Sequence, residues 1–86
     1  MIILIFIVNG EDVPVEANET SPIDTAKDKA LAVSHNTGRP PNEWEIRNER
    51  GALLDPNTPV SDLDLINGSH LFLTLQVGFG GEKEIP

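Results

Sequence analysis

The first apolar segments of the chain differ in their spacing. Ile2–Val8 is an unbroken run of β-branched, aliphatic and aromatic residues, which is typical of a strand. Asn9-Gly10 follows the run and is the strongest short signal for a hairpin turn. Apolar and polar residues then alternate over residues 12–17, which predicts a half-buried second strand. Pro14 within that segment indicates an open edge of the sheet, because proline cannot donate to a neighbouring strand.

The apolar spacing next changes to the period of a helix, which we expect from Pro22 to His35 or Asn36. Ser21 is the candidate cap, Asp24 stands where a capping box places its acidic residue, and Gly38 is the expected stop. The apolar side of this helix consists of Ile23, Ala26, Ala30, Leu31 and Val33.

The second half of the chain alternates again. Trp44 and Ile46, separated by charged residues, predict a third strand and belong to the expected core, and residues 52–54 predict a short fourth strand. A loop over 55–59 and one capped helical turn over 61–66 precede a final strand over 71–77. The resulting class is α+β, with one main helix packed on one face of a mixed sheet of about five strands.

The composition narrows the functions that this single domain can have. The 86 residues include 14 acidic and 6 basic side chains and no cysteine, for a net charge of −8. The charge disfavours a nucleic-acid partner, and the missing thiols exclude a disulfide framework and a cysteine nucleophile. The apolar run at the start is too short to cross a membrane, and it lacks the basic flank and the cleavage site of a signal peptide, so we expect a cytoplasmic protein.

No set of side chains in the sequence indicates catalysis. His35 and His70 lack a nucleophile or a metal-ligand pattern, and the glycines near the end lack the helix and lysine of a phosphate-binding loop. We therefore expect no enzymatic activity, no metal and no cofactor.

Several segments resemble ubiquitin and its β-grasp relatives. They are the two lysines Lys27 and Lys29 after Ile23-Asp24, the connector Gly38-Arg39-Pro40-Pro41-Asn42, the segment Thr58–Leu63, and the leucine-rich last strand followed by Gly80-Gly81. The resemblance covers residues 1–81 and rests on the order of the elements more than on any one motif. It implies a β-grasp domain over 1–77, a flexible tail over 78–81, and an extension over 82–86 that a peptidase removes.

The resemblance also implies a mechanism centred on the end of the tail. After cleavage between Gly81 and Glu82, an activating enzyme would adenylate the Gly81 carboxylate and take the acyl group as a thioester. A conjugating enzyme would then pass it to an amine of a target protein. Gly80 and Gly81 have no side chains that would hinder a narrow enzyme channel. The implied partners are the activating enzyme, the conjugating enzyme, a JAB-type or other processing peptidase, and the protein targets.

Departures from ubiquitin suggest dedicated partners. Arg47 and Thr74 replace residues of the apolar docking patch of ubiquitin, and Gln76 replaces an arginine that its activating enzyme selects. The tail is one residue longer and contains Phe79. The sequence is more similar to bacterial ubiquitin-like proteins, whose genes accompany activating-enzyme, conjugating-enzyme and JAB-peptidase homologues, than to eukaryotic ubiquitin.

The register of the first hairpin is open from the residues alone. A two-residue turn at Asn9-Gly10 pairs Val8 with Glu11 and places Leu4 and Phe6 beside Val13 and Val15, whereas a bulged turn turns Ile3, Ile5 and Ile7 toward the core. The resemblance favours the bulge. In that register Leu4, Phe6 and Phe72 form an apolar cluster on the open face, which is a candidate docking surface with Arg47, Gln76 and Phe79.

The helix carries two candidate amines for chain formation, Lys27 and Lys29, although helical lysines more often form a solvated face. Two other functions fit the same fold. A sulfur carrier would hold a thiocarboxylate at Gly81, and a non-conjugated interaction domain would not use the tail at all. The extension after Gly81 favours the modifier, because carriers typically end at the two glycines.

Overall fold

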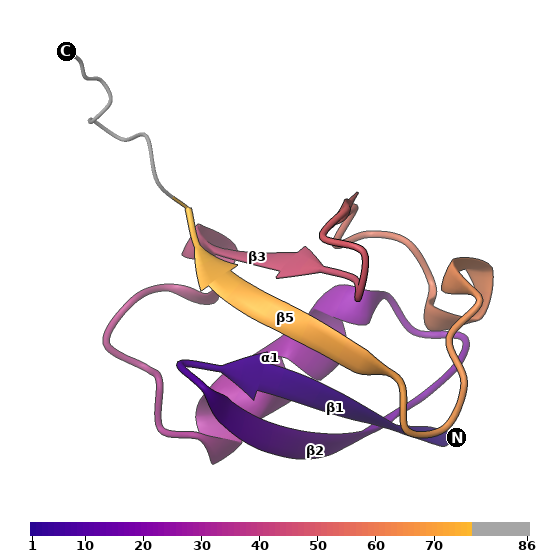
Figure 1. Ribbon diagram of the computed structural model, residues 1–86, viewed down its shortest axis with the longest axis horizontal. Helices are drawn as coiled ribbons and strands as arrows, with labels where there is room; N and C mark the ends of the chain where they lie inside the picture. Colours follow the sequence, from indigo (N-terminus) through magenta and orange to yellow (C-terminus); the bar gives the residue numbers. More distant parts are fainter. Residues whose placement is uncertain (77–86) are drawn as a thin grey trace, which may run out of the picture.

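The computed structural model describes residues 1–76, which form a mixed five-stranded sheet with one main helix on one face (Figure 1). The elements in chain order are β1 (Ile2–Val8), β2 (Glu11–Ala17), α1 (Ile23–Val33), the 3₁₀ turn η1 (Pro41–Glu43), β3 (Trp44–Arg47), β4 (Leu53–Leu54), the 3₁₀ turn η2 (Val60–Leu63) and β5 (His70–Leu75). This arrangement confirms the α+β class and the β-grasp order predicted from the sequence.

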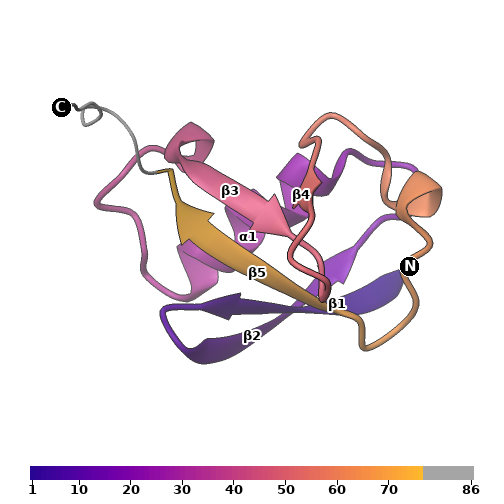
Figure 2. The same cartoon turned by 45° about the horizontal axis from the view of Figure 1, so that its top comes forward.

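The sheet has the strand order β2-β1-β5-β3-β4. β1 and β5 lie side by side at its centre and run parallel, while all other neighbours are antiparallel. Figure 2 shows the short β4 at the far edge beside β3. The domain is therefore held together at its centre by its first and last strands.

The first hairpin has the two-residue turn, and the bulged register that the resemblance favoured is wrong. Val8 pairs with Glu11 and Phe6 with Val13, and both Asn9 and Gly10 have positive φ values of 52° and 80°. Such angles at both central residues match the right-handed twist of the two strands, and asparagine followed by glycine adopts them most readily. The even-numbered residues of β1 consequently face the helix.

The core lies between this face of the sheet and α1. The side chains of Leu4 and Phe6 are 0% exposed, so neither belongs to an open-face cluster. Trp44 and Ile46 are buried, as predicted. The other buried apolar residues are Val8, Val13, Val15, Ala17, Ile23, Ala26, Ala30, Leu31, Val60, Leu71 and Leu73.

The start of α1 is held by another loop and not by its own cap. The backbone N–H groups of Ile23 and Asp24 donate to the carbonyls of Thr58 and Pro56, at 2.9 and 3.1 Å. Pro22 occupies the cap position, and no side chain caps the helix. The predicted Ser21 cap and the Asp24 capping box are therefore wrong, because the loop before η2 already satisfies these donors.

α1 also ends earlier than the sequence suggests. His35 takes the left-handed conformation with φ 62°, and the Asn36 N–H donates to the Leu31 carbonyl at 2.8 Å. This is the geometry of a helix C-cap, so His35 and not Gly38 terminates the helix. Val33, expected on the apolar side, is largely exposed. The predicted boundary after residue 77 and the segments 78–81 and 82–86 lie outside the described residues.

Candidate functional site

The face of the sheet opposite α1 carries no other element of the described chain (Figure 1). Odd-numbered residues of β1 point to it, together with alternate residues of the neighbouring strands. The two-residue turn determines which residues of β1 face the helix. The open face therefore carries the odd-numbered residues of β1, whereas the bulged register would place the even-numbered ones there.

Three isoleucines form a row along the centre of the open face. Ile3, Ile5 and Ile7 are partly exposed, and Ile7 pairs in register with Phe72 of β5. Phe72 is 37% exposed, as expected from the sequence. We call these four residues, Ile3, Ile5, Ile7 and Phe72, the apolar strip. The sequence offered a signal for the strip in the Asn9-Gly10 pair, because the two-residue turn that such a pair favours gives this register.

Polar residues on β3 and β5 limit the strip on one side. Arg47 is paired with Phe72 in the register, donates to the Gly51 carbonyl at 2.9 Å and forms an ion pair with Glu45 at 3.2 Å. Thr74 pairs with Glu45 and is exposed. This side of the strip is thus bordered by an arginine held by its neighbours and by an exposed hydroxyl group.

Two carboxylates limit the strip on the other side. In the β1–β2 register Asp12 lies opposite Ile7 and Glu16 opposite Ile3, and both acidic residues are exposed. Within residues 1–76 neither carboxylate takes part in an ion pair. The edge strand therefore presents a carboxylate without an ion-pair partner in the described chain near each end of the row of isoleucines, and the Lys29 ammonium lies close to the backbone of Glu16.

The last described residue, Gln76, marks the base of the tail. Its side chain is exposed, and its backbone N–H donates to the Glu43 carbonyl at 2.8 Å, which ties the end of β5 to η1. Phe79, Gly80, Gly81 and Glu82 lie outside the described residues.

The two helical lysines differ sharply in accessibility. Lys27 is 2% exposed, and its Nζ forms an ion pair with Asp24 Oδ1 at 2.7 Å. A buried ammonium group is not accessible as an acceptor amine for chain formation, and it does not belong to a solvated face of the helix. Lys29 is exposed, with its Nζ 3.4 Å from the Glu16 carbonyl, and it remains a candidate acceptor. The pKa of Asp28 is raised above its ordinary value, first by partial burial and then by the nearby Asp24 carboxylate. The positive charge of Lys27 acts in the opposite direction and lowers this pKa.

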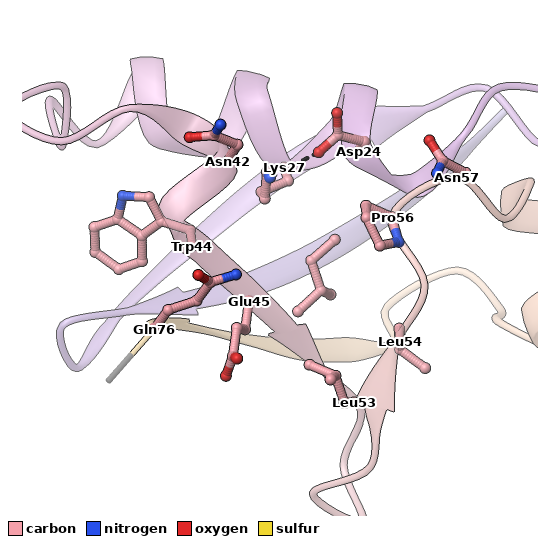
Figure 3. Close-up of a pocket in the computed structure, with 11 residues that line it drawn as sticks. Asp24, Lys27, Asn42, Trp44, Glu45, Leu53, Leu54, Pro56, Asn57 and Gln76 are labelled. Atoms are coloured by element: carbon pink, nitrogen blue, oxygen red, sulfur yellow. Dashed lines mark ion pairs between the residues drawn. The ribbon is translucent and has the colours of Figure 1, made fainter. Parts of the chain in front are cut away.

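A pocket of about 220 Å³ opens beside this ion pair (Figure 3). Asp24 and Lys27 line it from α1, Trp44 from β3, Leu53 from β4, and Gln76 from the base of the tail. The Trp44 Nε1 is buried without a hydrogen-bond partner in the described chain. In Figure 3 the Nε1 edge of the indole faces Asn42 and not the middle of the pocket.

Two further kinds of site are absent from residues 1–76. No helix there is long and apolar enough to cross a membrane. No group of three or more His, Asp or Glu side chains there could hold a metal ion.

Comparisons with known proteins match the fold and the family. Residues 1–81 match the model of a family described as "Protein of Unknown function (DUF2604)". A relative from Sinorhizobium fredii, "Uncharacterized protein y4jI", is 38% identical over 78 residues, which are 91% of this chain and 60% of that protein. This chain therefore spans less than two thirds of its relative.

One solved structure has a similar fold. It is described as the crystal structure of ATBAG1 in complex with HSP70, and it superposes with a TM-score of 0.73 at 13% sequence identity. The match covers 90% of this chain and 41% of that chain. At this identity the likeness shows the fold alone.

Proposed function

The chain belongs to the family described as Protein of Unknown function (DUF2604), and we propose that it is a ubiquitin-like protein modifier joined to its targets through the Gly81 carboxylate. The observation that carries the proposal is the position of Gly80-Gly81 shortly after the central strand β5 of a β-grasp domain. A pair of glycines is a weak motif alone, and its structural context gives it meaning.

Two further observations support this function. The family match ends at Gly81, so residues 82–86 lie outside the part of the chain that the family model covers. The strand that leads to the tail is rigidly held, because β5 pairs with both β1 and β3. A folded domain that presents an unhindered glycine carboxylate is suited to recognition by enzymes that act on its end.

The proposed reaction sequence starts with a peptidase of the JAB type that hydrolyses the Gly81–Glu82 peptide bond. An ATP-dependent activating enzyme adenylates the freed carboxylate, with release of pyrophosphate, and an enzyme thiolate then displaces AMP to form a thioester. A conjugating enzyme passes the acyl group to a lysine amine, which releases the thiol. The domain itself supplies the acyl group and the recognition surface and performs no catalysis.

The test uses the sequence around the tail. We suggest expressing the 86-residue chain with an N-terminal tag in the organism that encodes it, and isolating covalent adducts under denaturing conditions. Chymotrypsin cleaves after aromatic residues, so cleavage after Phe79 would leave Gly80-Gly81 on the modified lysine. Trypsin is unsuited, because no Lys or Arg lies between Arg50 and Gly81.

The matched control is a chain that ends at Phe79, which lacks only the glycines and the extension. Gly-Gly remnants on lysines with the full chain, and none with the control, are the expected result. Adducts that form equally with the control would overturn the proposal. A sulfur carrier would instead yield a free chain that ends at Gly81 with one oxygen replaced by sulfur, and a non-conjugated domain would retain Glu82–Pro86.

A further inference from the structure

The apolar strip has the composition and the shape of a docking surface. Its three isoleucines and Phe72 lie side by side on β1 and β5, at the centre of a sheet face that no other described element covers. Contiguous exposed apolar side chains with a polar rim are typical of interaction sites. What occupies the strip follows from the charges beside it.

The flanking charges disfavour several occupants. A second copy would bring another net charge of −8 against Asp12 and Glu16. The end of this chain contains Glu82, Lys83 and Glu84, a net negative segment that the same carboxylates repel. An anionic lipid surface is repelled in the same way.

The dimensions of the strip match a helix. Ile3 and Ile7 are four residues apart on a strand, which is about 13 Å. A helix that lies along β1 advances about 12 Å over eight residues, and it presents apolar side chains on one face at every third or fourth position. Asp12 and Glu16 are likewise four residues apart and lie opposite the two ends of the strip. Basic residues about eight positions apart on that helix would meet both carboxylates.

We propose that the apolar strip, with Asp12 and Glu16 beside it, binds an amphipathic helix of a partner protein that has an aliphatic face and a basic flank. The helix packs on the open face of the sheet as α1 packs on the other, with Phe72 at one end of the contact and the carboxylates along the β2 side. This surface is separate from the tail chemistry, so the inference stands whether or not Gly81 is conjugated.

The test is a titration of the isotope-labelled 86-residue chain with synthetic helical peptides of about 18 residues, which is long enough to form a helix on binding. One peptide carries leucines on one face and lysines on the flank, and a second carries glutamates in place of the lysines. The expected result is saturable chemical-shift change at β1, β2 and Phe72 with the lysine peptide only. Binding should weaken as salt is added.

Two variants test the residues. Ile5→Thr with Ile7→Thr keeps β-branched side chains in β1 and should weaken binding at least about tenfold, which is about 1.4 kcal/mol. The matched control is Ile66→Thr, the same change at an exposed isoleucine in the turn before β5, and it should bind like the natural chain. The double variant Asp12→Lys with Glu16→Lys should reverse the preference, so that the glutamate peptide binds more tightly than the lysine peptide.

Several results would overturn the proposal. They are equal binding of both peptides, shift changes confined to the helix side, or Ile5 and Ile7 variants that bind normally while remaining folded. Binding at the strip by a peptide of residues 77–86, by anionic vesicles, or by a second copy in sedimentation would assign a different occupant and would contradict the basic helix.

Discussion

Comparison of Phe6→Ala with Ile5→Thr tests whether the even-numbered or the odd-numbered residues of β1 pack against α1. Phe6 is completely buried under α1, whereas Ile5 lies partly exposed on the opposite face. Removal of a buried phenylalanine side chain costs about 3–5 kcal/mol, through lost transfer energy and the cavity that remains. A domain of this size is stable by roughly 5–10 kcal/mol, so Phe6→Ala should remove a large part of its stability. Ile5→Thr should cost about 1 kcal/mol or less.

Urea unfolding, followed by tryptophan fluorescence, measures the difference. Trp44 is the one tryptophan in the sequence and is buried in the core, so its emission reports the loss of tertiary packing. With a urea dependence of about 1 kcal/mol per molar, Phe6→Ala should lower the midpoint by roughly 3 M, or leave no folded baseline. A larger loss for Ile5→Thr than for Phe6→Ala would refute the two-residue turn and restore the bulged register.

Three further outcomes follow from the helix. Acetylation of the folded chain by an amine-reactive ester should modify Lys29 rapidly and Lys27 only on unfolding, as peptide mass spectrometry would detect; rapid modification of Lys27 would contradict its burial. Asp24→Ala leaves the buried Lys27 ammonium without its partner and should cost roughly 1–3 kcal/mol in the same urea assay, more than Lys27→Met, which removes the buried charge. A larger loss for Lys27→Met would contradict the penalty for an unpaired buried ammonium. Because the folded state raises the pKa of Asp28, its carboxylate destabilises the fold above that raised pKa and has no effect below the ordinary pKa. Asp28→Asn should therefore raise the Tm at pH 7, with a difference that vanishes in acid, and a lower Tm at pH 7 would contradict this.

The order of the elements could be predicted because local patterns and tertiary packing agree. The run Ile2–Val8 and the alternation at Trp44 and Ile46 each match the spacing of the structure they form. The pair Asn9-Gly10 is compatible with two registers, and the two-residue turn, one of the two, is the one that the structure has. The prediction of the bulged register failed because the resemblance to ubiquitin was given more weight than the turn chemistry. A shift of one residue in the register exchanges the core face and the open face of β1.

Other features depend on contacts that are distant in the sequence. The start of α1 is satisfied by carbonyls of Pro56 and Thr58, which no local pattern near Ser21 indicates. Lys27 is buried because the segment around Trp44 packs against the helix and Asp24 supplies its counter-charge. Among the candidate sites, the positions of Phe72 and Lys29 on exposed surfaces agree with the sequence analysis, while Leu4, Phe6 and Lys27 do not.

The proposed function depends on which residue ends the working form of the chain. The most direct measurement is the intact mass of the protein and of its covalent adducts, purified under denaturing conditions from the organism that encodes it. We expect chains that end at Gly81, joined through that residue to lysines of other proteins. A population that always retains Glu82–Pro86, with no branched adducts, would contradict it.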